Sequence, residues 1–421
     1  MIEGVINILK IIEIGCEYMD NNNEHGKYAQ MMNANLIVFA LFSNISTAIT
    51  SICIVLGALI MLVQFIKTGN IPRPDKKITS IVAIFLLIWF VLCFFSQDIL
   101  VSLKGLWGYA YRFLPLFMVI MYVKTIKQLL YLIEAFAVSV MIDDVYFIFQ
   151  EIKLFLSGVP FKAIRPSAFN HSPTFVASYM LMAIPVLAIM SQNINLDKKY
   201  RISMLTLSIL SVLVLLLSQT RGAWLAFPVI ILAAIVIAKK YRKKLIVISL
   251  LMGIILSVFV LTSASLSERF SSISNPATFS VHQRFLMWDS AVNMFKDYPV
   301  TGVGMEMYGP IYLEKYIHPD EFERMTHPHN NYLKILTEGG IIGFSATAAL
   351  HLYIMLLFFK HLRICNMNND FAIIAILMML GIHLEGITDT TIHNVPIMRE
   401  YWLLIGICYM GSTYLLKNNK I

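Results

Sequence analysis

The sequence predicts an all-α integral membrane protein with about twelve membrane-spanning helices. Of its 421 residues, 58% are apolar and only 14% are charged, and the mean hydropathy is +0.72. A single soluble surface cannot accommodate this composition. The apolar residues also gather in stretches close to the roughly 20 residues that cross a bilayer. We therefore expect the whole chain, residues 1–421, to form one membrane domain.

Polar residues divide the chain into twelve candidate spans. Their approximate bounds are 28–45, 48–66, 78–96, 107–123, 128–149, 173–191, 202–218, 222–238, 245–263, 335–359, 371–388 and 397–416. The first two are open to a second interpretation, because the run from Asn35 to Ile66 is long enough for one tilted helix.

Basic residues predict the orientation of these spans. More than half of the 33 Lys and Arg residues lie in alternate connections and in the C-terminal tail: KTGNIPRPDKK, KTIK, DKKYR, KKYRKK, KHLR and LKNNK. Short basic loops remain in the cytoplasm, so both termini are predicted to be cytoplasmic. The first 30 residues lack the features of a removable signal peptide, which agrees with that orientation. The long loop 264–330, between the ninth and tenth spans, then faces outward.

The outer loop contains an expected amphipathic helix, HQRFLMWDSAVNMFKDY. Its apolar stripe predicts contact with the bilayer surface or with the protein core and consists of Phe285, Trp288, Val292 and Phe295. Gly302 and Gly304 in the following PVTGVG are interpreted as turn residues. The five cysteines are scattered and lie mostly in apolar segments, so we interpret them as packing residues, with neither disulfides nor a metal site.

Three arginines on the predicted outer face indicate an anion-binding site. Arg221 lies in SQTRGAW between two spans, Arg284 lies in the amphipathic helix, and Arg165 lies in KAIRPSAF. Positive charge is disfavoured on this side of a membrane. A guanidinium presents forked donors that match phosphate and stays charged when partly desolvated. The alternative is a snorkelling or helix-capping role for Arg221 and an ordinary surface position for the other two.

The stretch THPHNNYLKILTEGG, at the outer end of the tenth span, contains the candidate catalytic residue His329. A neutral imidazole accepts a proton near neutral pH. His327 and His329 also have the H-x-H spacing of zinc ligands, although a third ligand would have to be a distant carboxylate. A third interpretation is helix capping, for which Asn330 and Asn331 are well suited. Glu338, Gly339 and Gly340 are expected to serve close helix packing.

In this order, SQTRGAW, HQRFLMWDSAVNMFKDYPVTGVG and HPHNNYLKILTEGGIIG resemble the O-antigen ligase and polymerase superfamily of bacterial envelope glycosyltransferases. The resemblance implies a C-type glycosyltransferase fold in the bacterial inner membrane, with the site on its periplasmic face. It implies an undecaprenyl-diphosphate-linked glycan as donor, and no cofactor or metal. By matching motif, His329 looks catalytic, and Arg221 and Arg284 look like the diphosphate-binding arginines. Asp389, in EGITDTTIHN, matches the acidic position at the outer end; Arg165 is expected to assist donor binding, and His327 and Asn330 to support the site.

The chemistry agrees with a metal-independent glycosyltransferase. Breaking a sugar–diphosphate bond places negative charge on the leaving group, which preorganised cations stabilise. There is no DxD motif to hold a metal, since Asp143 and Asp144 are adjacent and lie inside a predicted helix. The net charge of +8 resides largely in short loops and does not indicate a nucleic-acid partner.

The expected activity is that of an O-antigen ligase, with lipid A-core as the acceptor. A polysaccharide polymerase and a protein O-oligosaccharyltransferase would use the same donor and remain alternatives. A lipid-linked glycan flippase or other transporter is a more remote alternative. Transporters place ionisable groups at the midplane and often have repeated halves; here Glu134, His351 and His383 are the deep candidates, and no repeat is visible.

Overall fold

The computed structural model describes residues 24–169, 172–250, 253, 279–321 and 325–418. Within these residues the secondary structure is helical, with no strand, which confirms the all-α class; five or six of the twelve predicted spans qualify as membrane-crossing by length and composition. The helices are α2 (Glu24–Phe42), α3 (Thr47–Thr68), α4 (Lys76–Cys93), α5 (Ile99–Ala110), α6 (Leu114–Tyr122), α7 (Ile126–Leu156), α8 (Pro173–Gln192), α9 (Lys198–Leu217), α10 (Arg221–Ile237), α13 (Phe279–Asp297), α14 (Tyr308–Ile311), α15 (Asn331–Ile364), α16 (Asp370–Glu385) and α17 (Val395–Asn418). A further helix, Lys239–Leu250, follows α10.

Most helix bounds agree with the predicted spans, with three informative exceptions. The first two spans are separate helices: α2 ends at Phe42, and Ser46 caps α3 by accepting a hydrogen bond from the Ile49 backbone. The single tilted helix is therefore wrong. The expected helix 107–123 is interrupted by a 3₁₀ turn at Tyr111–Phe113. The expected helix 245–263 lies largely outside the described residues.

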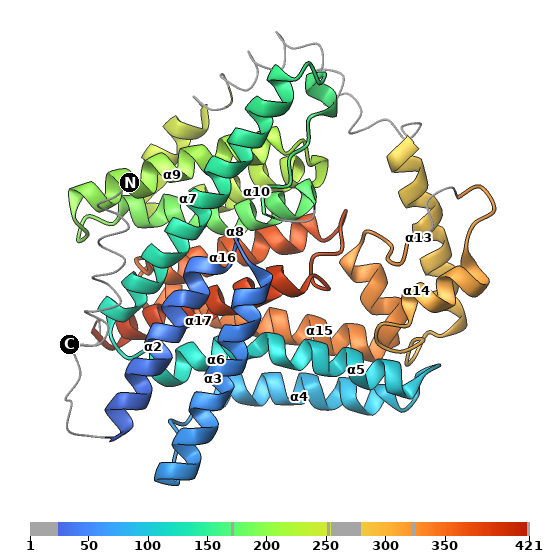
Figure 1. Cartoon of the computed structure of the whole chain (residues 1–421), viewed down its shortest axis with the longest axis horizontal. Helices are drawn as coiled ribbons and strands as arrows, with labels where there is room; N and C mark the ends of the chain where they lie inside the picture. Colours follow the sequence, from blue (N-terminus) through green and yellow to red (C-terminus); the bar gives the residue numbers. More distant parts are fainter. Residues whose placement is uncertain (1–23, 170–171, 251–252, 254–278, 322–324, 419–421) are drawn as a thin grey trace.

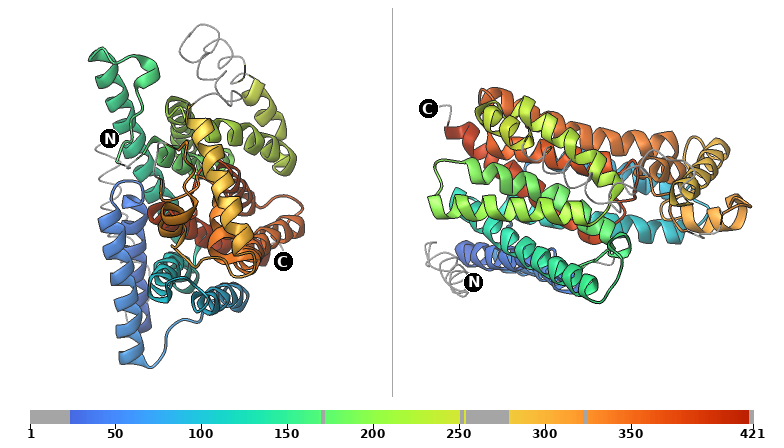
Figure 2. Two further views of the ribbon diagram at one scale, coloured as in Figure 1. Left: turned by 90° about the vertical axis from the view of Figure 1, so that its right-hand side faces the viewer. Right: turned by 90° about the horizontal axis from the view of Figure 1, so that it is seen from above.

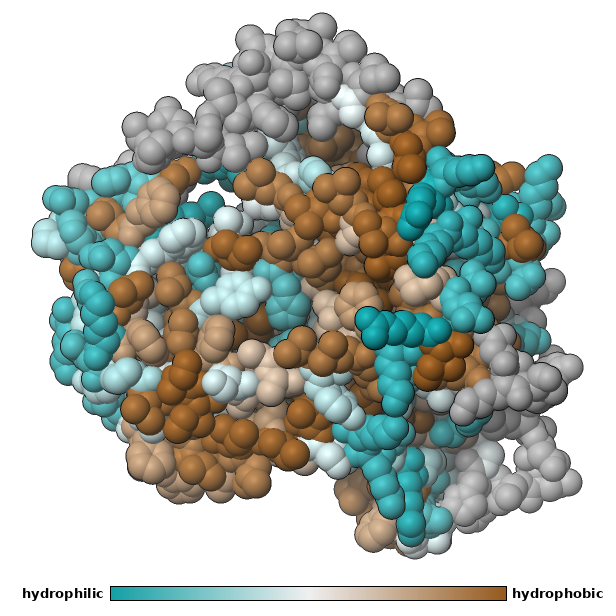
Figure 3. Space-filling view, turned by 180° about the vertical axis from the view of Figure 1, so that it is seen from behind, coloured by the Kyte–Doolittle hydropathy of each residue, from teal (hydrophilic) through white to brown (hydrophobic). Residues whose placement is uncertain are grey.

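The described helices identify an integral membrane protein. Five of them are long and apolar enough to cross a bilayer, namely α3, α4, α8, α9 and α15. A sixth is added if α10 and Lys239–Leu250, which are bent by 97° relative to each other, form one broken span. Figure 3 shows a broad apolar surface between two polar margins, as a bilayer requires.

The connections between helices gather at two opposite ends of the bundle (Figures 1 and 2). At one end, the Tyr241 hydroxyl donates to the Asp370 carboxylate, and Lys244 donates to Gln192. This end holds the connections DKKYR, KKYRKK and KHLR that the sequence placed on one side. At the other end lie α13, α14 and the start of α15.

Helix α15 is broken after its second turn, and a loop fills the break. Gly340 has φ 58° and ψ −161°, a conformation that only glycine adopts readily. The amides of Ile341 and Ile342 bond to the carbonyls of Pro299 and Val300. The carbonyls of Thr337 and Glu338 accept from the backbone of Val303 and Gly304 instead. All four interrupted backbone groups are thus satisfied, which is the condition for irregular backbone near membrane depth.

Both glycines of the PVTGVG turn lie in the left-handed region, with φ 69° at Gly302 and 110° at Gly304. They are turn residues as predicted, and they also allow a close approach. A Cβ on Gly302 would lie 2.4 Å from the backbone of Glu338. Gly339 packs against the Trp89 ring, which confirms the expected helix packing of this segment.

Helix α13 confirms the helix expected in the loop 264–330. The face that it buries differs from the predicted apolar stripe. Its buried face consists of Met287, Ala291 and Met294, which pack on α14 and the segment after it. Phe285 and Val292, in the predicted apolar stripe, are exposed. Trp288 and Phe295 are half-buried, and Trp288 contacts Pro328, so the stripe is only partly packed against the protein. Its bilayer-surface role stays a prediction. The four described cysteines are buried and free, as expected.

Candidate functional site

The histidine stretch is fixed by the cap of α15 and by the loop between α16 and α17. Asn330 is the N-cap residue, and its side-chain oxygen accepts from the amides of Tyr332 and Leu333. Its side-chain amide donates to the carbonyl of Ile387, 2.9 Å away. Asn331 bonds to Thr391 and Ile392 of the same loop. The capping role expected for these asparagines is present, and it also docks loop 386–394 against the start of α15.

This docking brings His329 and Asp389 together. The His329 Nδ1 atom lies 3.2 Å from Asp389 Oδ1, and the two side chains are 18% and 10% exposed. Since an ionised carboxylate only accepts hydrogen bonds, Nδ1 is the donor and the outer nitrogen, Nε2, is left as an acceptor. His329 has φ 48°, an uncommon conformation for a residue with a side chain. A constrained, half-buried histidine oriented by a carboxylate is suited to general-base chemistry.

Asp389 is held in its charged form. Burial is the largest single influence and would raise the pKa of this carboxyl. The hydrogen bond from His329, the charge of that ring, the Thr390 amide and Arg284 together outweigh burial, so the pKa is lowered. The amide of Thr390 donates to the same oxygen at 2.7 Å, and the positive charge of Arg284 acts in the same direction. Arg284, on α13, therefore belongs to the electrostatic environment of the His329–Asp389 pair.

His327 lies beside His329, with 4.4 Å between the ring centres. Burial and the neighbouring His329 lower the pKa of His327 to about 4, so this ring is neutral at physiological pH. The Trp288 indole of α13 donates to the carbonyl of Pro328, between the two histidines, at 2.9 Å. Helix α13 is thereby joined directly to the histidine stretch.

The segments that carry Arg221 and Arg165 are adjacent to this site. Arg221 is the first residue of α10, and the next residue, Gly222, packs so tightly on Thr388 that a Cβ would lie 2.0 Å from its hydroxyl. Gln219 donates to the carbonyls of Phe161 and Ile164, the residue before Arg165. The start of α10 thus joins loop 386–394 to the Arg165 segment. Because Gly222 packs on Thr388 and the adjacent Asp389 contacts His329, these segments lie at the same end of the bundle as His329.

A partly buried ionic cluster lies one turn below the histidines. Lys334 Nζ lies 2.9 Å from Glu338 Oε1 and 3.6 Å from Glu306 Oε2. His393 Nδ1 lies 3.3 Å from the other oxygen of Glu306. Burial and the charge of Lys334 lower the pKa of His393 to about 3, which keeps this ring neutral. Glu338 also accepts from the Tyr308 amide, so the cluster connects α14 and α15.

The sequence interpretation missed this cluster, although one signal was present. Lys334 and Glu338 are four residues apart in an apolar helix, so they share one face and can pair. Charged residues within a membrane helix are rare unless paired. Glu338 had been assigned to helix packing alone; in the structure it is 1% exposed and ion-paired. Glu306 and His393, from two separate loops, carry no comparable local signal.

His327, His329 and Asp389 also form a group that can hold a metal ion. One ligand atom from each lies within 4.8 Å of the others. The zinc interpretation required a distant carboxylate as third ligand, and in the structure Asp389 lies in that position. Two histidines and a carboxylate with an open fourth position are a donor set that catalytic zinc uses.

Comparison with known proteins agrees with the motifs. Residues 206–348 match the family model described as O-antigen ligase. The resemblance drawn from the sequence is confirmed over this part of the chain, which contains Arg221, Arg284 and His329. Arg165 and Asp389 lie outside it. The chain is also similar to an uncharacterized protein of Haemophilus influenzae, with 24% identity over 176 residues. That match covers 38% of this chain and 44% of the relative.

Proposed function

We propose that this protein is an O-antigen ligase-type glycosyltransferase, which moves a glycan from undecaprenyl diphosphate to an acceptor hydroxyl. The observation that carries the proposal is the His329–Asp389 pair, held at the end of the bundle beside Arg284. The match to the O-antigen ligase family model over residues 206–348 supports the same donor chemistry. A polyprenyl chain stays in the lipid while its diphosphate meets the membrane boundary, where this pair lies.

In the proposed step, the acceptor hydroxyl attacks the anomeric carbon of the donor sugar. Nε2 of His329 takes the hydroxyl proton, and Asp389 stabilises the resulting imidazolium. The bond between the anomeric carbon and the phosphate oxygen breaks, and the electron pair leaves with undecaprenyl diphosphate. Arg221 and Arg284 bind the diphosphate and stabilise the added charge, with Arg165 assisting.

The direct test uses purified protein and an undecaprenyl-diphosphate glycan. His329→Ala is expected to abolish transfer while donor binding stays within about threefold of wild type, because the arginines hold the diphosphate. His327→Ala is expected to be milder. Wild-type transfer by His329→Ala would reduce this histidine to a structural residue and refute the mechanism.

The arginine roles are tested by changing geometry while keeping charge. Arg221→Lys and Arg284→Lys should each weaken donor binding and slow transfer, since lysine cannot make forked contacts with a diphosphate. Lys296→Arg, on the exposed surface of α13, is the matched control and should leave both unchanged. Full activity of both lysine variants would contradict a diphosphate clamp.

The acceptor is proposed to be lipid A-core, and a three-acceptor assay decides it. Lipid A-core, a second lipid-linked glycan and a pilin-like protein are offered in parallel with one donor. Product on lipid A-core supports the ligase. Product on the second glycan assigns a polymerase, and product on the protein assigns an O-oligosaccharyltransferase.

The membrane arrangement proposed with this function has twelve spans, cytoplasmic termini and residues 264–330 in the periplasm. A cysteine introduced at Pro310 should react with an impermeant reagent added from the periplasmic side. One introduced at Lys243 should not. The reverse pattern would place the site in the cytoplasm and contradict the donor assignment.

A zinc-dependent transferase is the second candidate, because His327, His329 and Asp389 approach one another closely enough to share an ion. A bound Zn²⁺ would polarise the leaving diphosphate or lower the pKa of the acceptor hydroxyl. Elemental analysis and treatment with a chelator separate the candidates. The metal-independent proposal expects full activity after chelation; loss that Zn²⁺ restores would favour the metal site.

A further inference from the structure

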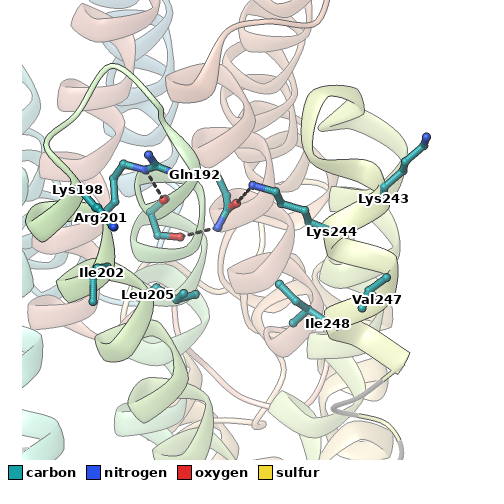
Figure 4. Close-up of a pocket in the computed structure, with 10 residues that line it drawn as sticks. Gln192, Lys198, Arg201, Ile202, Leu205, Lys243, Lys244, Val247 and Ile248 are labelled. Atoms are coloured by element: carbon teal, nitrogen blue, oxygen red, sulfur yellow. Dashed lines mark hydrogen bonds between the residues drawn. The ribbon is translucent and has the colours of Figure 1, made fainter.

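A groove is present at the opposite end of the bundle from the histidine stretch. An open groove of about 670 Å³ lies between the start of α9 and the helix Lys239–Leu250 (Figure 4). Ser191 and Gln192, the last residues of α8, lie at its head. The groove is separate from the proposed catalytic residues, since α8 runs the length of the bundle between the two ends.

The groove combines positive charge with an apolar wall. Its basic residues are Lys198, Arg201, Lys243 and Lys244. One turn further along each helix, the lining becomes apolar: Ile202, Leu205, Val247 and Ile248. Ile202 and Val247 are 54% and 56% exposed, so this wall is not covered by the described part of the protein. In both α9 and the helix Lys239–Leu250, the basic residues come first and the apolar residues follow.

The head of the groove is organised by hydrogen bonds to uncharged groups. Arg201 Nε donates to the carbonyl of Ser191 at 3.2 Å, and Lys244 Nζ donates to Gln192 Oε1 at 3.4 Å. Gln192 in turn donates to the Ser191 hydroxyl. Within the described residues, neither Arg201 nor Lys244 forms an ion pair with a carboxylate. Their charge is held on the two sides of Gln192, as Figure 4 shows, while Lys243 extends outward.

We infer that this groove binds an anionic phospholipid of the cytoplasmic leaflet, a phosphatidylglycerol or cardiolipin. The phosphate would bind between Arg201 and Lys244, and an acyl chain would cover Ile202, Leu205, Val247 and Ile248. Basic pockets between membrane helices on the cytoplasmic side favour such head groups. A free phosphate would leave the apolar wall unused, and a zwitterionic lipid has no net negative charge to attract the basic residues.

Native mass spectrometry of the delipidated full-length protein tests the inference. The probes are tetraoleoyl cardiolipin, dioleoyl phosphatidylglycerol, dioleoyl phosphatidylcholine and inorganic phosphate. Cardiolipin binding should weaken about 30-fold in the double variant Arg201→Gln/Lys244→Gln, since each basic residue near an anionic surface contributes a factor of about five. Lys244→Gln alone should weaken it about fivefold and keeps the Arg201 contact to α8.

The control is Lys199→Gln/Lys360→Gln, which removes the same charge from exposed positions that do not line the groove. It should change cardiolipin binding by less than twofold. An equal loss in this control would mean diffuse attraction to a basic surface and would overturn the site. So would equal binding of phosphatidylcholine. Displacement of cardiolipin by millimolar inorganic phosphate would assign a free-anion site and refute the lipid.

Discussion

Replacing the carboxylate that orients His329 should disable the enzyme without unfolding it. Asp389 Oδ1 lies 3.2 Å from His329 Nδ1 and accepts the Thr390 amide at 2.7 Å. Because both contacts fall on the same oxygen, the side-chain oxygen of Asp389→Asn can still accept from Thr390 and from Nδ1. The negative charge is lost, however. A neutral amide no longer stabilises the imidazolium that forms when Nε2 takes the acceptor proton.

The expected loss follows from the missing negative charge beside the imidazolium. Carboxylate partners of catalytic histidines contribute about 10²–10⁴-fold to turnover, so we expect kcat to fall at least 100-fold, which is about 2.7 kcal/mol in the barrier. Donor KM should stay within about threefold, because the arginines are unchanged. The loss of one charge-assisted hydrogen bond lowers stability by about 1.5–3 kcal/mol.

The assay is single-turnover transfer from a radiolabelled lipid-linked glycan, with the melting temperature measured in the same detergent. Asp320→Asn is the matched control, since Asp320 pairs with His318 at 3.8 Å on the exposed surface, with 77% of its side chain accessible. It should retain full activity. A near-wild-type kcat in Asp389→Asn, or an equal loss in both variants, would refute the orienting role.

Three further predictions concern the support beneath the site. Lys334→Met should destabilise the protein by about 3–5 kcal/mol, because it leaves Glu338 buried without its cation; adding Glu338→Gln should restore most of the lost melting temperature. Gly340→Ala should cost about 3 kcal/mol or more, from its φ of 58° and a Cβ 2.3 Å from the backbone. Gly108→Ala, in open space within α5, should cost nothing and can stabilise the helix by up to about 1 kcal/mol. The lowered pKa of His393 predicts acid sensitivity. In the unfolded chain this histidine is protonated below about pH 6.5, whereas in the folded protein it stays neutral down to about pH 3. The free energy of unfolding should therefore fall by about 1.4 kcal/mol between pH 7.5 and pH 5.5. Melting temperatures across that range should fall less in His393→Gln; an equal fall would contradict it.

Local patterns in the sequence were enough for the all-α class and for most helix bounds. An apolar stretch near bilayer length forms a helix because its backbone has no other hydrogen-bond partner in lipid. The ends of α8, α10 and α16 therefore follow from where the polar residues begin. The polar stretch SNIST favoured separate α2 and α3, but one tilted helix stayed possible until the structure showed the cap at Ser46.

The sequence named the candidate site residues one by one, but it did not predict which of them contact each other. His329 and the arginines were candidates because the predicted topology places them at the outer end of membrane helices, where positive charge and imidazoles are unusual. Nothing local indicates that Asp389 pairs with His329 across 60 residues of sequence. That pairing depends on Asn330 and Asn331, which dock loop 386–394 on the start of α15.

Composition and loop charge by themselves determined that this chain is a helical membrane protein with a polar, arginine- and histidine-bearing end. Composition and loop charge act through the transfer free energy of each segment between water and lipid, which depends on that segment alone. Only the tertiary structure decided which polar groups meet: Asp389 with His329, Lys334 with Glu306 and Glu338, and the Gly340 break with Pro299 and Val300. Each of these contacts requires two distant segments to be held within about 3–4 Å, and the packing of α13, α15 and α16 sets those distances.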